Sequence, residues 1–209
     1  MKERRIFSDA CISEGADWLC QHEPRFAVAM EVLPQLPLRL KPDGFAELLS
    51  AIVSQQVSVA SANAIWGRLV GAGMTTPNVV AQASEDDLRA LGLSGQKVRY
   101  AHALARAEID YAALHEKSAD EVIKTLTAVS GIGPWTAEIY AMFSLGRADV
   151  FPPGDLALQA AAKQLFELPQ RPREKDFRAM SLAWSPWRSV AARILWAYYK
   201  HNKQREGLR

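Results

Sequence analysis

Cysteine is scarce in this chain of 209 residues, which contains only two. Two thiols cannot form a scaffold of several disulfides or a four-thiolate metal cluster, so both classes of protein are excluded. The histidines are scattered without the spacing of metal ligands, and we assign them no role. These residues are Cys11 and Cys20, and His22, His102, His115 and His201. We therefore predict an intracellular protein with reduced cysteines.

Long apolar runs are also missing, and no segment approaches the ~20 apolar residues that cross a bilayer. The first 18 residues are basic at their start but lack the apolar stretch of a signal peptide. We therefore expect a cytoplasmic protein without a membrane span, associated with the nucleoid if the source is bacterial. A hydrophobic content of 49% with 23% charged residues excludes a disordered chain.

The net charge of +2 is small, but it conceals an uneven distribution. Residues 171–209 contain 10 Lys and Arg against 3 Asp and Glu, a local net charge of +7. Residues 1–170 contain 15 against 20, a net charge of −5. The basic C-terminal stretch can attract phosphates, although a solubilising helix end explains it as well.

Alternating strand patterns are almost absent, and the one candidate, residues 37–40, is too short to found a sheet. Helical periodicity dominates instead. An apolar stripe from Phe45 to Val53 follows a candidate N-cap at Asp43, and capping boxes begin at Ser84 and Ser118. Further helices are expected at 9–33 (two helices), 58–70, 96–111, 135–145, 155–166, 174–184 and 186–200. We predict an all-α protein whose helices form two lobes around a cleft, the natural place for a site.

Two glycines, Gly131 and Gly133, separate two of these helices in the sequence Ser-Gly-Ile-Gly-Pro. Backbone N–H groups in such a turn, beside a helix N-terminus, can bind an anion such as a DNA phosphate. An ordinary turn between helices is the alternative.

Asp155 follows Pro152, Pro153 and Gly154 and stands at a helix start. From position alone, the simplest interpretation is an N-cap. The alternative is a fixed carboxylate that stabilises positive charge on a sugar while a glycosidic bond breaks.

The segment 126–137, LTAVSGIGPWTA, resembles the helix-hairpin-helix element of the DNA glycosylase superfamily named after that hairpin and a Gly-Pro-Asp segment. Other segments follow the family's order, and the C-terminal ones are similar to the 3-methyladenine DNA glycosylase II (AlkA-like) branch. These segments are 45–58, 91–97, 149–158, 184–189 and 194–198. The resemblance covers about residues 37–200.

This resemblance implies a DNA glycosylase fold within one unit, residues 1–209, with the hairpin motif at about 118–146. One lobe would comprise about residues 42–154, and the other residues 1–41 with 155–209. Relatives often carry an N-terminal β-rich domain, for which the ~40 residues before the match are too few.

The resemblance makes Asp155 the catalytic carboxylate. Trp135 occupies the position where related bifunctional enzymes have a lysine that forms a Schiff base, so the chain is expected to be monofunctional. Trp135 and Trp196 would line the base pocket, because an indole stacks well on a cationic base; core packing is the alternative for each. We expect the remaining tryptophans, Trp18, Trp66, Trp184 and Trp187, in the core, and Glu138 and Asp149 as surface or capping residues.

For DNA contact, the resemblance implies backbone amides of Gly131, Gly133 and Thr136 at a phosphate. Gln56, at the end of its helix, would fill the gap left by the flipped nucleotide, although a helix-terminal polar residue is an equally simple interpretation. No cofactor is required, and the cysteines needed for the family's iron–sulfur cluster are missing. A monovalent cation is expected at the backbone carbonyls of Thr127, Val129 and Ile132.

The expected function is therefore monofunctional base excision from double-stranded DNA containing alkylated bases such as 3-methyladenine and 7-methylguanine, by a monomer. Two alternatives remain open. A non-catalytic helix-hairpin-helix module would bind DNA without chemistry, and a glycosylase for other damaged bases would act on a different lesion.

Overall fold

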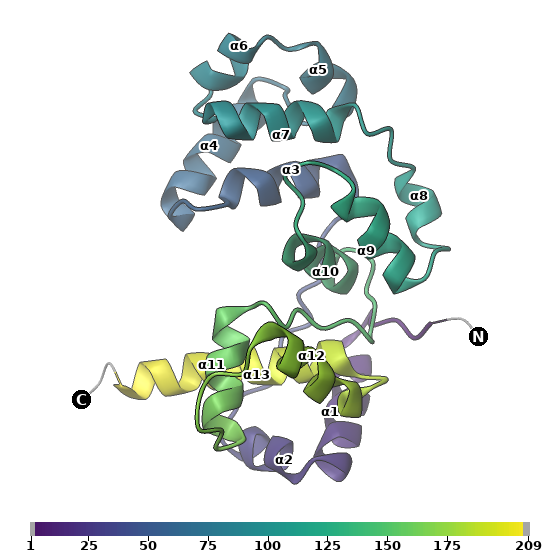
Figure 1. Cartoon of the computed structure of the whole chain (residues 1–209), viewed down its shortest axis with the longest axis vertical. Helices are drawn as coiled ribbons and strands as arrows, with labels where there is room; N and C mark the ends of the chain where they lie inside the picture. Colours follow the sequence, from purple (N-terminus) through teal and green to yellow (C-terminus); the bar gives the residue numbers. More distant parts are fainter. Residues whose placement is uncertain (1–2, 207–209) are drawn as a thin grey trace. The chain divides into compact units, whose positions relative to one another are not determined.

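The computed structural model describes residues 3–206, with side chains described up to residue 204, and helices are the regular secondary structure of this part (Figure 1). No strand occurs in this part, where Arg5 and Arg147 form an isolated bridge. The all-α prediction is confirmed. The helices are α1 (Asp9–His22), α2 (Pro24–Glu31), α3 (Phe45–Ser54), α4 (Val59–Gly71), α5 (Pro77–Gln82), α6 (Glu85–Ala90), α7 (Gly95–Ala105), α8 (Tyr111–Leu114), α9 (Ala119–Thr127), α10 (Pro134–Phe143), α11 (Leu156–Leu165), α12 (Glu174–Ser181), the 3-10 helix η1 (Leu182–Trp184) and α13 (Arg188–Glu206).

The chain divides into two compact units. The central unit is Lys41–Tyr140, and the terminal unit combines Met1–Leu40 with Ala141–Arg209. The central unit ends at Tyr140 rather than near residue 154. Residues after 140 belong to the terminal unit because their backbone is tied to the N-terminal segment: the amide of Ile6 donates to the carbonyl of Gly146 at 2.7 Å.

In the central unit, helix α3 presents the apolar stripe expected from the sequence. The side chains of its stripe are at most 5% exposed: Phe45, Leu48, Leu49, Ile52 and Val53. The capping boxes at Ser84 and Ser118 are also confirmed, each with both reciprocal hydrogen bonds.

The N-cap of α3 is Gly44, so the assignment of that role to Asp43 is wrong. Gly44 has a φ of 101°, a left-handed conformation that suits glycine, and its amide donates to the Tyr140 hydroxyl at 2.7 Å. The carboxylate of Asp43 contacts Nε2 of His115 at 2.6 Å. The chain thus enters α3 through a glycine turn that takes Asp43 away from the helix amides.

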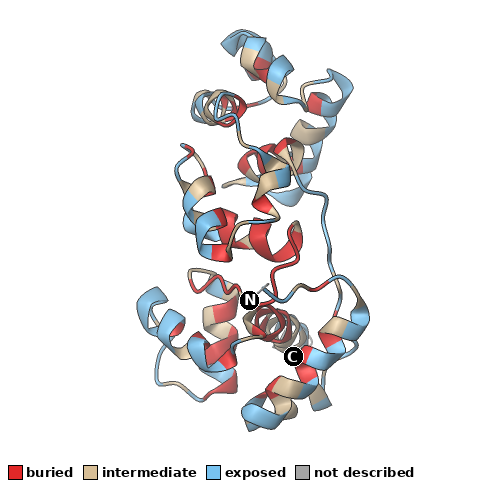
Figure 2. Cartoon of the chain, turned by 90° about the vertical axis from the view of Figure 1, so that its right-hand side faces the viewer, coloured by how far each residue is buried: buried red, intermediate tan, exposed pale blue. Residues whose placement is uncertain are grey.

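The terminal unit has an aromatic core around Trp184. The rings of Phe26, Phe151, Phe166 and Phe177 lie 5.2–6.0 Å from that indole, centroid to centroid. Figure 2 shows buried residues on the inner faces of the helices in each unit. Trp184 and Trp187 are core residues as expected, each 2% exposed. Trp18 and Trp66 are only half-buried, so their assignment to the core was wrong; Trp18 stacks on His22.

We expect Gly15→Ala to lower the melting temperature. A Cβ on Gly15, in α1, would lie 2.7 Å from carbon atoms of both Trp187 and Val190. Overpacking of this kind costs about 1–3 kcal/mol. Gly67→Ala in α4 is the matched control, because a Cβ there has open space and alanine favours a helix by about 0.5–1 kcal/mol. Thermal unfolding followed by circular dichroism should move in opposite directions for the two variants; a Gly15→Ala protein that melts at or above the wild-type temperature contradicts the close packing.

None of the helices in residues 3–206 combines the length and apolarity that crossing a bilayer requires. Cys11 and Cys20 are both free thiols.

Candidate DNA interface and catalytic carboxylate

The turn between α9 and α10 is a tight hairpin built from consecutive backbone hydrogen bonds. The amide of Val129 donates to the carbonyl of Leu126, and the amide of Ile132 donates to the carbonyl of Val129, both at 3.1 Å. Gly131 has a φ of 96°, which only glycine adopts readily. The helix-hairpin-helix geometry expected from the sequence is therefore present in the central unit.

Two side chains outside the hairpin hold this turn in place. The Gln55 side-chain amide donates to the carbonyl of Gly131 at 2.9 Å. The Tyr100 ring packs so closely that a Cβ on Gly131 would lie 2.4 Å from it. Lys97, one turn before Tyr100 on α7, donates to the carbonyl of Val53 at 2.6 Å, and its burial lowers the pKa of its amine. Gln55, the C-cap of α3, and Tyr100, on α7, thus hold the hairpin backbone.

The amides expected to meet a phosphate lie in the hairpin and the first turn of α10. N–H groups in the first turn of a helix have no acceptor within the helix, and the partial positive charge of the dipole lies there. Gly133 is exposed and has open space at its Cβ position, so a ligand atom can approach its backbone closely. The Thr136 side chain is buried, at 6% exposure, which leaves only its backbone for this role.

Trp135 lies in the same first turn and is 46% exposed. An indole with so much exposed apolar surface is not a core residue. Its position makes it available to a ligand that approaches the start of α10.

Gln56 lies beyond α3, not at its end, because the helix stops at Ser54. Its φ of 56° places it in the left-handed region, and its side chain is exposed. It lines a groove of about 320 Å³ together with Val57, Lys97 and Tyr100. The sequence prediction of a helix-terminal glutamine is wrong in detail; the residue stands at the tip of a turn.

Asp155 is the N-cap of α11 in the terminal unit. One of its carboxylate oxygens, Oδ1, accepts hydrogen bonds from the amides of Ala157 and Leu158 at 2.9 and 3.0 Å. The preceding loop closes through the Asp155 amide, which donates to the Pro152 carbonyl at 3.1 Å. Gln159 donates to the Pro153 carbonyl at 2.8 Å. The carboxylate is therefore held in one orientation by backbone groups.

The loop that leads to Asp155 is fixed by α13. Arg188 binds both carboxylate oxygens of Asp149, at 2.7 and 3.1 Å, and the Ser189 hydroxyl donates to the carbonyl of Arg147 at 2.6 Å. Asp149 is thus a half-buried ion-pair partner.

Glu138 lies within α10 and is only 2% exposed, so the prediction that it lies at the surface was wrong.

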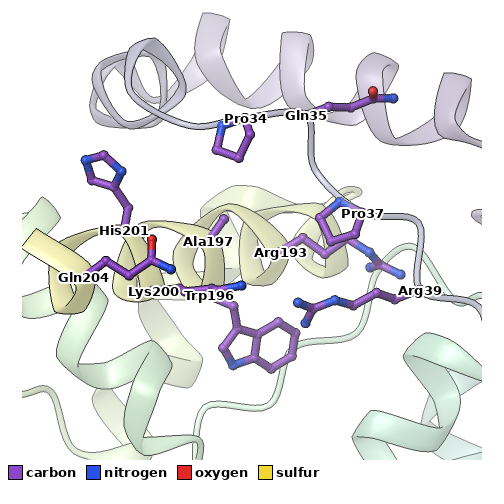
Figure 3. Close-up of a pocket in the computed structure, with 10 residues that line it drawn as sticks. All are labelled: Pro34, Gln35, Pro37, Arg39, Arg193, Trp196, Ala197, Lys200, His201 and Gln204. Atoms are coloured by element: carbon purple, nitrogen blue, oxygen red, sulfur yellow. The ribbon is translucent and has the colours of Figure 1, made fainter.

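Trp196, on α13, lines a cavity of about 390 Å³ that belongs entirely to the terminal unit (Figure 3). Its indole lies 5.9 Å from the Phe143 ring, centroid to centroid, at an interplanar angle of 31°. Arg39 and Arg193 also line the cavity.

Sequence reasoning missed four residues around these sites: Gln55, Tyr100, Arg39 and Arg193. Gln55 is adjacent to Gln56 in the sequence, and nothing in the pattern distinguishes the one that supports the hairpin. The two arginines are 154 positions apart in the sequence, so no local pattern predicts that they line the same cavity.

Within residues 3–206 no group of three or more His, Cys, Asp and Glu side chains is placed to hold a metal ion.

Comparisons with known proteins agree with this architecture. Residues 49–188 match the family described as HhH-GPD superfamily base excision DNA repair protein. The Bacillus subtilis protein named putative DNA-3-methyladenine glycosylase YfjP is 31% identical over 77% of this chain, an alignment that covers 60% of the relative's length.

Two solved structures are also similar. The Bacillus halodurans DNA-3-methyladenine glycosidase aligns with a TM-score of 0.82 and 33% identity, over 98% of this chain and 95% of that one. The Schizosaccharomyces pombe 3-methyladenine DNA glycosylase Mag1, solved in complex with abasic DNA, aligns with a TM-score of 0.74 and 29% identity, over 88% and 95%. The hairpin between α9 and α10, the aspartate that caps α11 after a proline-rich loop, and a family match over two thirds of the sequence agree: the chain belongs to the HhH-GPD superfamily of base excision DNA repair proteins.

Proposed function

We propose that this protein is a monofunctional DNA glycosylase that hydrolyses the N-glycosidic bond of damaged bases, with alkylated bases as its main class of substrate. The observation that carries the proposal is the Asp155 carboxylate, oriented by two backbone amides directly after a Pro-Pro-Gly loop. The 3-methyladenine glycosylase names of the similar proteins support the substrate class.

Asp155 acts on the sugar in this proposal. Breaking the bond between C1′ and the base nitrogen builds positive charge on the sugar ring. A fixed carboxylate stabilises that charge or orients the attacking water without reorganising during the reaction. A base alkylated on a ring nitrogen is already cationic and leaves as a neutral molecule, so a second carboxylate to protonate it is not needed.

Two tryptophans receive the base. Trp135 is exposed at the start of α10, and Trp196 lines the cavity of the terminal unit. The electron-rich face of an indole attracts an electron-poor cationic ring. Because Trp135 has no amine, it cannot form a Schiff base with the sugar, so the strand remains intact after the base leaves.

DNA is bound through the hairpin of the central unit. The amides of Gly131, Gly133 and Thr136 are offered to one phosphate, at the positive end of the α10 dipole. Gln56 stands at the tip of its turn with an exposed side chain, suited to enter the duplex where the nucleotide is flipped out. The local net charge of +7 in residues 171–209 adds long-range attraction for the duplex.

We propose that the hairpin binds a monovalent cation. The carbonyls of Thr127, Val129 and Ile132 lie at the C-terminal end of α9 and in the turn, where hard oxygen donors and the negative end of a helix dipole favour a cation. The Val129 carbonyl already accepts the Ile132 amide and keeps a second lone pair. The cation would link the hairpin to a phosphate and has no part in bond cleavage.

Methylated duplex DNA incubated with the protein should show strand cuts only after treatment with hot alkali. Base release leaves an abasic site, which is stable until alkali cleaves it, and Trp135 provides no amine for enzymatic cleavage. Gel electrophoresis of an end-labelled duplex measures the cuts, and the unmethylated duplex is the control.

Each other outcome of that experiment has a definite meaning. Cuts without alkali would show a lyase and overturn the monofunctional assignment. No cuts under either condition, with DNA binding retained, would indicate a helix-hairpin-helix module that uses Asp155 only as a helix cap.

A further inference from the structure

The turn between α3 and α4 is joined to the hairpin between α9 and α10 by the side chain of Gln55. Residues 55–58 form this turn, here named the insertion turn, which carries Gln56. Gln55 is the C-cap of α3, and its backbone amide donates to the carbonyl of Ile52 at 3.2 Å. Its side-chain amide donates to the carbonyl of Gly131 at 2.9 Å, 76 positions further along the chain. Gln55 therefore binds α3 with its backbone and the hairpin with its side chain.

Gln56 is held in an unfavourable backbone conformation between two fixed ends. Its φ of 56° is in the left-handed region, which non-glycine residues rarely adopt and which persists only where neighbouring contacts impose it. On one side, Gln55 is tied to both α3 and the hairpin. On the other side, Ser58 is the N-cap of α4, and its hydroxyl accepts the amide of Ser61 at 3.2 Å. The direction in which the exposed Gln56 side chain leaves the protein is therefore set by the residues on either side of it.

Helix α7 adds further contacts between the same segments. Helices α3 and α7 pack side by side (Figure 1). Lys97 of α7 donates to the carbonyl of Val53, in the last turn of α3, at 2.6 Å, and the Tyr100 ring lies against Gly131. Lys97 and Tyr100 also line the groove beside Gln56. The end of α3, the insertion turn, the start of α7 and the hairpin thus form one connected set of contacts inside the central unit.

A DNA duplex presents a phosphate and the gap left by a flipped nucleotide at a separation that the DNA itself sets. A protein that occupies both must hold two groups at the matching separation, and a displacement of about 1 Å can lower a rate by about 100-fold. We infer that Gln55 is a positioning residue, whose bond to Gly131 fixes the distance between the phosphate-binding amides of the hairpin and Gln56. The inference rests on the proposed function, in which the hairpin binds a phosphate and Gln56 enters the duplex.

A glutamine suits this role because it has the length and the donor group that the contact with Gly131 uses. Methionine has nearly the same length but no donor, and an ionised glutamate has the same length but only accepts hydrogen bonds. Either substitution therefore removes the bond to the hairpin, while the backbone of residue 55 can still cap α3. Gln55 is only half-buried, so both substitutions leave the core of the unit intact.

A double-mutant cycle tests whether Gln55 acts through Gln56. Single-turnover base release from a duplex containing 7-methylguanine is measured with saturating enzyme for the wild type, Gln55→Met, Gln56→Ala and the double variant. We expect each single substitution to slow release about 10-fold. The double variant should be within about 2-fold of Gln56→Ala, because Gln55 then has no side chain left to position. Gln55→Glu, used in place of Gln55→Met, should give the same pattern.

Gln96→Met is the matched control. Gln96 lines the same groove, but its amide donates to the Tyr100 hydroxyl at 2.6 Å rather than to the hairpin backbone. This variant should therefore release the base at the wild-type rate. Thermal unfolding followed by circular dichroism gives the melting temperature of each variant, and all rates are measured below the lowest of these temperatures.

Effects that multiply, to about 100-fold in the double variant, would overturn the inference, because Gln55 would then act independently of Gln56. A wild-type rate for Gln55→Met or for Gln56→Ala would overturn it as well, and so would a Gln96→Met protein as slow as Gln55→Met. Each of these results leaves the proposed function standing, because the wild type still releases the base. A wild type that binds the duplex and releases no base refutes the proposed function itself.

Discussion

Asp155→Asn should lower the single-turnover rate of base release by about 10²–10³-fold, the usual effect of removing one preorganised electrostatic group from an active site. Asparagine retains an Oδ1 that can accept the amides of Ala157 and Leu158, so α11 keeps its N-cap. The substitution therefore removes the negative charge while preserving the local fold. Release of the damaged base from a labelled duplex measures the rate, and a gel-shift assay should show unchanged binding.

Asp110→Asn is the matched control for that experiment. Asp110 caps α8 through the same kind of hydrogen bond, to the amide of Ala113 at 2.9 Å. It lies in the other unit and has no proposed part in the reaction, so this variant should release the base at the wild-type rate. An Asp155→Asn protein with nearly normal release would reduce Asp155 to a helix cap and refute its catalytic assignment.

Gly131→Ala should weaken DNA binding at least 10-fold and lower the melting temperature. An added Cβ would meet the Tyr100 ring at 2.4 Å, and an L-residue at a φ of 96° is strained by about 1 kcal/mol or more before any overlap is counted. Relief of that overlap moves the hairpin backbone, which carries the amides offered to the phosphate. Fluorescence anisotropy with a labelled duplex measures affinity, and thermal unfolding measures stability.

Gly133→Ala, two residues further on, is the control for the loss of stability that we expect from Gly131→Ala. Gly133 has a negative φ and open space at its Cβ position, so this substitution should change the free energy of unfolding by less than about 1 kcal/mol. If Gly131→Ala unfolds at the temperature of Gly133→Ala, the close contact with Tyr100 does not constrain the hairpin.

Local patterns in the sequence predicted the helices well because each depends on neighbours within one or two turns. The apolar stripe of α3 and the capping box at Ser118 need only residues three or four positions apart. Asp155 was recognised as a helix start for the same reason, and its side chain does cap α11.

Features that depend on distant partners were missed or misplaced. Gly44 replaces Asp43 as N-cap because its amide binds Tyr140, 96 positions away in the sequence. Glu138 was expected at the surface, but α10 buries it, and a charged residue alone does not reveal which face of a helix is covered. Arg193 was counted only as part of a basic C-terminal region. Arg193 is buried with its guanidinium donating to the carbonyls of Ser189 and Leu38. No pattern within α13 indicates the contact with Leu38, which is distant in the sequence.

The division into two units has a consequence for synthesis on the ribosome. Residues 41–140 form one uninterrupted segment and can complete their core as soon as they emerge. Helix α1 cannot do the same, because the face that carries Gly15 packs on Trp187 and Val190, in and near α13, which are translated after the whole central unit. The side of α1 that carries Gly15 therefore stays unpaired until the chain has been made as far as α13. In the nascent protein, the central unit therefore matures first, and the unit that holds Asp155 closes only when α13 has been made.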